Sequence, residues 1–117
     1  MHSRVGYHDY EGVALEADEQ PRLVTDLGTN NALILRNHGL LSAGKTVAQA
    51  YLVHFLLEKA CAIQVVAQAG GTALNVMSAE MAERVAHQAM SDFSGGAPLV
   101  WAAALRKMDR LDPSFRD

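Results

Sequence analysis

Residues 32–69 combine a short apolar run, a sharp interruption and a long helical segment, and this succession limits the folds open to the chain. Ala32 to Leu35 is apolar without alternation, which predicts a strand that is covered on both faces. Residues 37–39 (Asn-His-Gly) interrupt the run, and Leu40-Leu41 resumes it before Gly44. Two short strands joined by a tight turn, or one strand with a kink at the glycine, both fit this pattern.

A long helix is expected after this turn. Thr46 and Gln49 form a capping box, in which the threonine oxygen accepts from the third amide and the glutamine reaches back. The helix should run from Val47 to about Ala69 and end at Gly70-Gly71. Five side chains fall roughly along one stripe of it, namely Val47, Tyr51, Phe55, Ala62 and Val66.

The flanking segments complete an outline of early strands and later helices. Arg4 to Tyr7 is a short strand candidate. Three more helices are expected, from the cap Asp18 to about Leu27, over residues 79–93 behind the cap Ser78, and from Pro98 to Pro113. This order predicts an α/β fold with α/β/α layers over residues 1–112, followed by a tail at 113–117. Two or three strands are a small sheet for this much helix, so the chain looks like part of a larger unit.

Length and composition exclude several classes of protein. The 117 residues carry 10 basic and 13 acidic side chains, a formal charge of −3, and the basic residues are scattered. Nucleic acid and anionic membranes are therefore not expected as partners. Polar residues interrupt the apolar stretch 47–69, so it is not expected to span a membrane. The single cysteine, Cys61, excludes an intrachain disulfide, and residues 1–10 lack the apolar core of a signal peptide, so a cytoplasmic location is expected.

Residues 39–46 match the phosphate-loop pattern G-x-x-x-x-G-K-[ST]. Three physical arguments count against a nucleotide site. Leu40 and Leu41 would place bulky apolar side chains around a bend whose amides should surround an anion. No later strand ends in an aspartate that would share a magnesium ion, and almost everything after Thr46 is helical. The other interpretation is that Gly44 ends a strand, Lys45 is solvated and Thr46 is only a helix cap.

His38 lies at a strand end in a sharp turn, where an imidazole can act as a metal ligand or acid–base group. A polar turn residue bonded to the backbone is the alternative. The five histidines form no H-x-H or H-E-x-x-H motif, and zinc needs three or four ligands. His8 and Asp9 are a weak local motif. Two further His–Glu pairs share helical faces and are typical of surface or core pairs, namely His54 with Glu58 and His87 with Glu83.

The stretch "NALILRNHGLLSAGKTVAQAYLVHFLLEKACAIQ" closely resembles the class II aldolase/adducin family, and "RVGYHDYEG" and "ALRKMDRLDPSFRD" are similar to this family too. The resemblance implies that His38 is one of three histidines that bind a divalent metal, usually zinc. It also implies that Tyr7 is the tyrosine that donates a proton in a neighbouring subunit of a tetramer. The implied chemistry is metal-assisted cleavage of a carbon–carbon bond in a sugar phosphate or aldehyde substrate, in which the cation stabilises developing negative charge.

The sequence departs from the family in one respect. The family's H-x-H pair, its acid–base glutamate and its phosphate-binding loop lie in an N-terminal half that nothing in this chain resembles. The chain therefore looks like the C-terminal half only, and we expect it to be inactive alone and to self-associate through uncovered apolar surface. A non-catalytic, adducin-like interaction module is the alternative, and a nucleotide binder is a third possibility.

Overall fold

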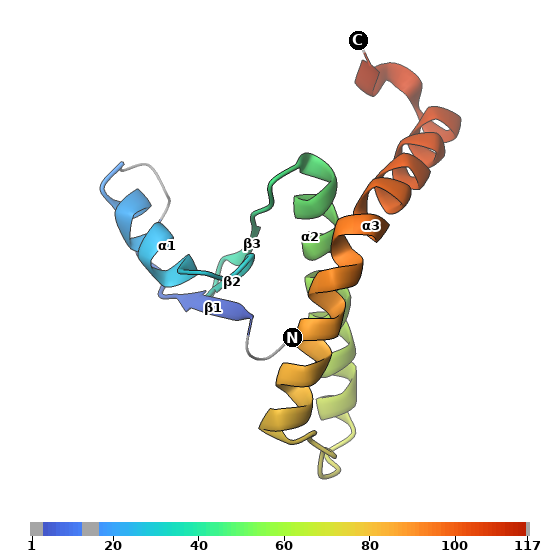
Figure 1. Cartoon of the computed structure of the whole chain (residues 1–117). Helices are drawn as coiled ribbons and strands as arrows, with labels where there is room; N and C mark the ends of the chain where they lie inside the picture. The colour runs from blue at the N-terminus through green and yellow to red at the C-terminus, as the bar shows by residue number, and fades with distance from the viewer. Residues whose placement is uncertain (1–3, 13–16, 117) are drawn as a thin grey trace.

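The first part of the chain forms a three-stranded sheet. The computed structural model describes residues 4–12 and 17–116, apart from the side chains of residues 90–94 (Figure 1). The strands are β1 (Val5–His8), β2 (Ala32–Leu35) and β3 (Gly39–Ser42), in the order β1-β2-β3. β1 pairs with β2 in parallel, and β2 pairs with β3 in antiparallel orientation. β2 is thus the central strand, which explains its continuous apolar sequence.

The interruption after β2 is a tight turn between two strands. The His38 amide donates to the Leu35 carbonyl at 3.1 Å, and Asn37 has a φ of 57°. Asparagine tolerates this left-handed conformation because its short side chain bonds locally. Of the two arrangements open from sequence, the structure has the hairpin.

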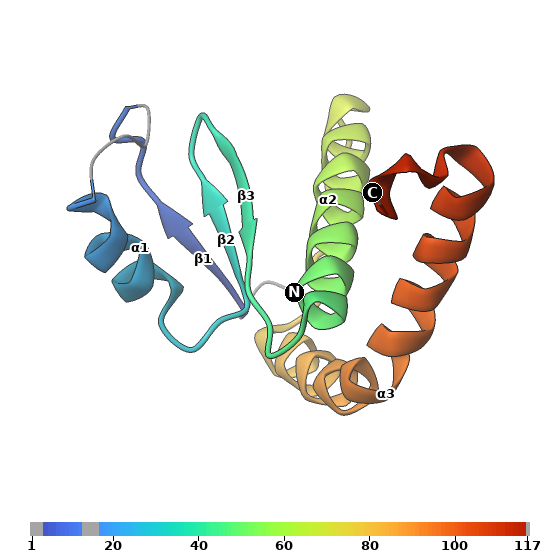
Figure 2. The ribbon, with the colours of Figure 1, turned by 90° about the horizontal axis from the view of Figure 1, so that it is seen from above.

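Helices cover the sheet from two sides. Figure 2 shows the strands between α1 (Glu19–Leu27) and α2 (Val47–Ala69), with α3 (Ala79–Leu111) beyond α2. The predicted α/β fold with an α/β/α layering is confirmed. Ala32 and Leu33 in β2 are 2% and 0% exposed, so the core lies around the central strand.

The caps predicted for α2 and α3 are present. Thr46 Oγ1 accepts from the Gln49 amide at 3.2 Å, and Ser78 Oγ accepts from the Met81 amide at 3.2 Å. The Gln49 side chain reaches back to the Lys45 amide at 3.0 Å, one residue before the cap itself. These bonds satisfy amides that a helix start otherwise leaves unpaired.

The apolar stripe predicted along α2 is largely exposed, so it does not mark the helix's packed face. Val47, Phe55 and Val66 are 68%, 43% and 75% exposed, whereas Leu52 and Leu57 are the buried residues of α2. The helix is apolar on most of its surface, and such a helix offers no single stripe from which the packed face can be chosen.

The prediction of two helices over residues 79–113 was wrong, because α3 continues through Gly95, Gly96 and Pro98. The prediction relied on the breaking tendency of glycine and proline. Figure 2 shows two arms of α3 that run in different directions. A proline inside a helix is accommodated by such a bend, because its ring displaces the preceding turn. After α3, the predicted tail forms the 3-10 helix η1 (Pro113–Arg116), tied to α3 by the Arg116–Asp109 ion pair.

Among the described residues, α2 is the one helix long and apolar enough to cross a membrane by length and composition. Its most apolar 18-residue window has a mean hydropathy of 1.4, and 11% of that window is buried. The core helix of a soluble protein passes the same test of length and composition, but such a helix is mostly buried.

Candidate functional site

Polar groups gather at the carboxyl end of the parallel strands. β1 and β2 end side by side at His8 and Leu35, and the turn that carries His38 follows directly. The Arg36 amide donates to the His8 carbonyl at 3.0 Å and so ties this turn to β1. Ligands of α/β sheets commonly bind outside the carboxyl ends of the strands. This end of the sheet is the candidate site.

His38 is exposed in the turn between β2 and β3. Its ring stacks on Tyr10, with the ring centroids 6.2 Å apart and an interplanar angle of 30°. Among the described residues, no side chain forms a hydrogen bond or ion pair with the imidazole. The ring is therefore oriented by an aromatic neighbour while both nitrogens stay available, a role for Tyr10 that the sequence analysis missed.

Tyr7 is 47% exposed, and the Arg36 guanidinium lies over its ring at 5.3 Å from the centroid. It lines a polar hollow of about 340 Å³ together with His8, Asp9, Glu11, Arg22, Thr25, Asp26 and Arg36. His38 is not among these lining residues. The two residues singled out from sequence thus lie at the same end of the sheet, and of the two it is Tyr7 that lines this hollow.

His8 is the most enclosed polar residue of this end, with 3% of its surface exposed. Its Nδ1 lies 2.7 Å from Asp26 Oδ2, and its Nε2 lies 3.3 Å from Glu19 Oε1 and 3.9 Å from Glu11 Oε1. The hydrogen bond to Asp26 is the main reason that the His8 pKa is raised above 6.5; burial opposes the shift, while Glu19 and Glu11 add to it. The local sequence gave little sign of this, because Asp26 and Glu19 come from α1.

His8, Glu11 and Glu19 are the one group among the described residues whose ligand atoms all lie within 4.8 Å of one another, as around a metal ion. Charge argues against a cation there. Arg22 Nε donates to both Glu11 oxygens at 2.9 Å, and this bond holds the pKa of Glu11 below its usual value. A divalent ion would have to displace the positive charge that Arg22 already supplies to Glu11. The group is best described as an ion-pair network that ties β1 to α1.

The first half of the segment that matches the phosphate-loop pattern is a strand. Residues 39–42 are β3 and pair with β2, and the Lys45 amide is bonded to Gln49. A Cβ on Gly44 would lie 2.7 Å from the Ala50 nitrogen, so this glycine permits close packing against α2. These amides are not arranged around an anion, which favours the strand-and-cap interpretation.

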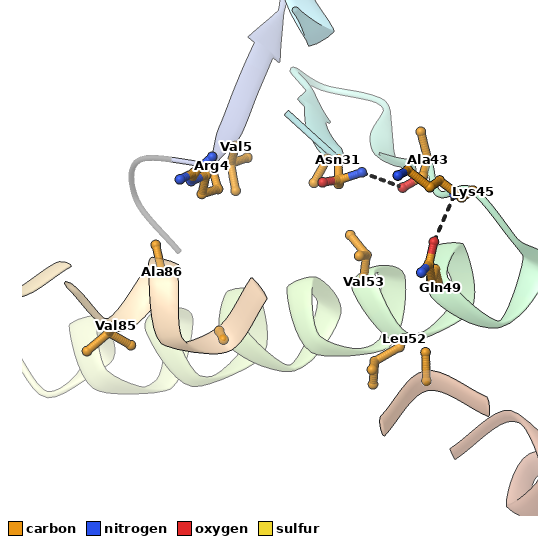
Figure 3. A pocket seen from close by; sticks show the side chains of 13 residues that line it. Arg4, Val5, Asn31, Ala43, Lys45, Gln49, Leu52, Val53, Val85 and Ala86 are labelled. Atoms are coloured by element: carbon orange, nitrogen blue, oxygen red, sulfur yellow. Dashed lines mark hydrogen bonds between the residues drawn. The ribbon is translucent and has the colours of Figure 1, made fainter. Parts of the chain in front are cut away.

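A second, apolar hollow of about 290 Å³ lies at the amino end of the parallel strands, between the sheet and the helices α2 and α3 (Figure 3). Val5, Ala32 and Leu52 contribute to its wall, and Asn31 Nδ2 donates to the Ala43 carbonyl at 3.2 Å at one side. Its lining is mainly apolar, and its polar members are Arg4, Asn31, Lys45 and Gln49. It lies at the opposite end of the strands from His38.

Three comparisons place this geometry among known proteins. The class II aldolase and adducin N-terminal domain matches residues 1–65. A Pseudomonas aeruginosa protein named "Putative aldolase class 2 protein PA3430" is 43% identical over 118 residues, which cover 97% of this chain and 46% of that protein. Alpha-adducin of Rattus norvegicus is 44% identical over 70 residues, covering 57% of this chain and 10% of the adducin.

A solved structure agrees with these sequence matches. The crystal structure of an aldolase II superfamily protein from Pseudomonas syringae superposes with a TM-score of 0.86 at 42% identity, covering 99% of this chain and 47% of that one. The chain thus spans about half the length of the bacterial relatives it matches. Because the family pattern covers more than half of the sequence and the backbone agrees throughout, the chain belongs to the class II aldolase and adducin family.

Proposed function

We propose that the chain supplies part of the active site of a class II aldolase-type, metal-dependent aldehyde lyase that acts on a sugar phosphate or aldehyde. The observation that carries the proposal is the exposed imidazole of His38 at the carboxyl end of the strands, without a competing hydrogen bond among the described residues. An imidazole that is oriented but not engaged suits a metal ligand. Zinc bound there would supply electrophilic stabilisation of the oxygens that become negative during carbon–carbon cleavage.

Among the described residues, His38 would supply one ligand of such a zinc site. The one ligand-like group in the described chain, His8 with Glu11 and Glu19, does not include His38. A catalytic zinc needs three protein ligands. We therefore propose that the chain is inactive alone and that the other ligands come from the rest of the family fold, of which this chain would be the C-terminal half.

Tyr7 is the proposed proton donor, acting toward a neighbouring subunit of a homo-oligomer such as a tetramer. Its half-exposed ring beneath Arg36, away from His38's own surroundings, supports a role across a subunit boundary. Arg36 would keep the ring in place, since a guanidinium over an aromatic face is attractive.

Metal analysis tests the ligand role. The chain is mixed with a separately produced polypeptide that carries the part of the P. aeruginosa relative outside the match, and zinc is measured after dialysis. We expect one zinc per complex, and a loss of at least about tenfold in zinc affinity for His38→Ala, as expected when a group in a metal site is removed. His54→Ala is the matched control, because His54 is also exposed and its side chain's one hydrogen bond among the described residues is the 3.4 Å contact with Ser42. Zinc retained equally by both variants would contradict the assignment.

A non-catalytic interaction module is the second candidate. It is favoured by the similarity to alpha-adducin and by the large apolar surface that the chain exposes. A complex that stays free of metal in zinc-replete medium would support this candidate over the lyase.

A further inference from the structure

The chain exposes more surface than a compact domain of its mass. Its accessible surface is 8712 Å², whereas a folded monomer of 12.6 kDa exposes about 6,200 Å². Its radius of gyration is 16.4 Å, against about 13 Å for a compact domain of this length. The excess exposed area is roughly 2,500 Å². One partner buries an area of about this size when it forms a large, permanent interface.

Seven of the eighteen exposed large hydrophobic residues of the described chain lie at one place, the end of the hairpin formed by α2 and α3. Every residue from 62 to 81 is exposed, although Glu80 is the one charged residue of these twenty. Seven large apolar side chains lie in this segment, which we name the hairpin tip: Ile63, Val65, Val66, Leu74, Val76, Met77 and Met81. Depletion of charge with retention of apolar side chains is typical of the core of an interface.

The hairpin tip continues into the apolar hollow at the amino end of the strands. Val85 lies one helical turn beyond Met81, is 42% exposed and lines the hollow together with Ala86 (Figure 3). A hollow of about 290 Å³ has room for a large apolar side chain from a covering segment. The hairpin tip and the hollow together form one continuous docking surface.

We infer that this docking surface binds the remaining part of a class II aldolase-type chain. That polypeptide packs on the hairpin tip and inserts apolar side chains into the hollow. The P. syringae protein has the same backbone over 99% of this chain, and this match accounts for 47% of its own length. In a chain of that length the other half is available to cover such a surface. The inference deepens the proposed function, since both take the missing groups to come from that half.

A binding experiment tests the docking surface without using metal or activity. The chain and the part of the P. aeruginosa relative outside the match are produced separately and mixed in a metal chelator. Size-exclusion chromatography with light scattering should give a 1:1 complex. The double variant Val66→Glu/Met77→Glu should weaken binding at least about a hundredfold, because two apolar contacts are replaced by buried charge, each change costing at least tenfold.

The control is Val24→Glu, which changes an equally exposed valine on α1, away from the docking surface. It should bind normally, and circular dichroism should show equal helix content in all variants. His38→Ala should also bind normally, so a failure of the zinc assignment is distinguishable from a failure of this inference. Self-association that the added segment does not reverse would overturn the inference in favour of a second copy. A chain that does not bind the added segment would also overturn the inference. Phosphatidylcholine vesicles, added in a separate measurement, would then show whether a membrane covers the surface instead.

Discussion

At the scale of single residues, His8 shows how position in the fold changes an ordinary side chain. Its sequence neighbour Glu11 lies 3.9 Å from its Nε2, but α1 brings Asp26 and Glu19 closer, one against each ring nitrogen. Asp26 above all favours the protonated ring and raises the pKa of His8 above 6.5. A histidine whose folded pKa is raised stabilises the fold fully below pH 6.5, and this stabilisation is lost as the pH rises through the folded pKa.

The free energy of unfolding should therefore fall as the pH is raised from 6 to 9, measured by urea titration followed by circular dichroism. His8→Gln should lower stability by about 1–3 kcal/mol at pH 6, because it leaves two carboxylates without their charged partner. The variant should also flatten the pH dependence in this window. If the free energy of unfolding of His8→Gln fell with pH as steeply as that of the unchanged chain, groups other than His8 would be the cause of the pH dependence.

At the scale of elements, the junction between β3 and α2 depends on one glycine. Gly44 lies so close to the first turn of α2 that a Cβ would come within 2.7 Å of the Ala50 nitrogen and 2.9 Å of the Gln49 Cβ. Backbone on one side of this contact cannot move without disturbing the cap at Thr46. The glycine that matches the phosphate-loop pattern is thus explained by strand–helix packing.

Gly44→Ala should destabilise the chain by about 1–3 kcal/mol in thermal or urea unfolding, as overpacking of a tight contact does. Gly39→Ala is a matched control, because a Cβ there meets nothing within 4 Å and the change should stay within about 0.5 kcal/mol. Equal effects of the two substitutions would argue against a packing role for Gly44.

At the scale of the whole molecule, the exposed surface determines behaviour in solution. Six apolar residues are buried in the described chain, whereas eighteen large hydrophobic residues are exposed. Soluble monomers rarely leave apolar patches of this size uncovered. In the absence of a covering segment, the docking surface of one copy will meet that of another.

The purified chain should therefore show a mass above 12.6 kDa that grows with concentration in light scattering. Val66→Glu/Met77→Glu should shift this association to concentrations at least about tenfold higher, because charge at the hairpin tip opposes its burial. A strictly monomeric chain at millimolar concentration would contradict the prediction.

Features that depend on residues close together in the chain could be predicted from the sequence. The continuous apolar run of β2, the caps Thr46 and Ser78, and the turn at His38 all follow from residue type and spacing, because capping and turn formation involve atoms only a few residues apart. The family was also recognisable, since the Asn-His-Gly-Leu turn and its flanks lie in one continuous stretch of sequence.

Features that depend on contacts between residues far apart in the sequence were determined only by the tertiary structure. His8 is bonded to Glu19, which is 11 positions away, and to Asp26, which is 18 positions away. The packed face of α2 is set by the sheet and α3 and not by its own stripe. α3 passes through Gly95, Gly96 and Pro98. Burial, charge pairing and helix bending are properties of contacts between elements, which the order of residues does not express. For the same reason only the fold shows that His38 and Tyr7 lie at one end of the sheet and that, of the two, Tyr7 lines the polar hollow there.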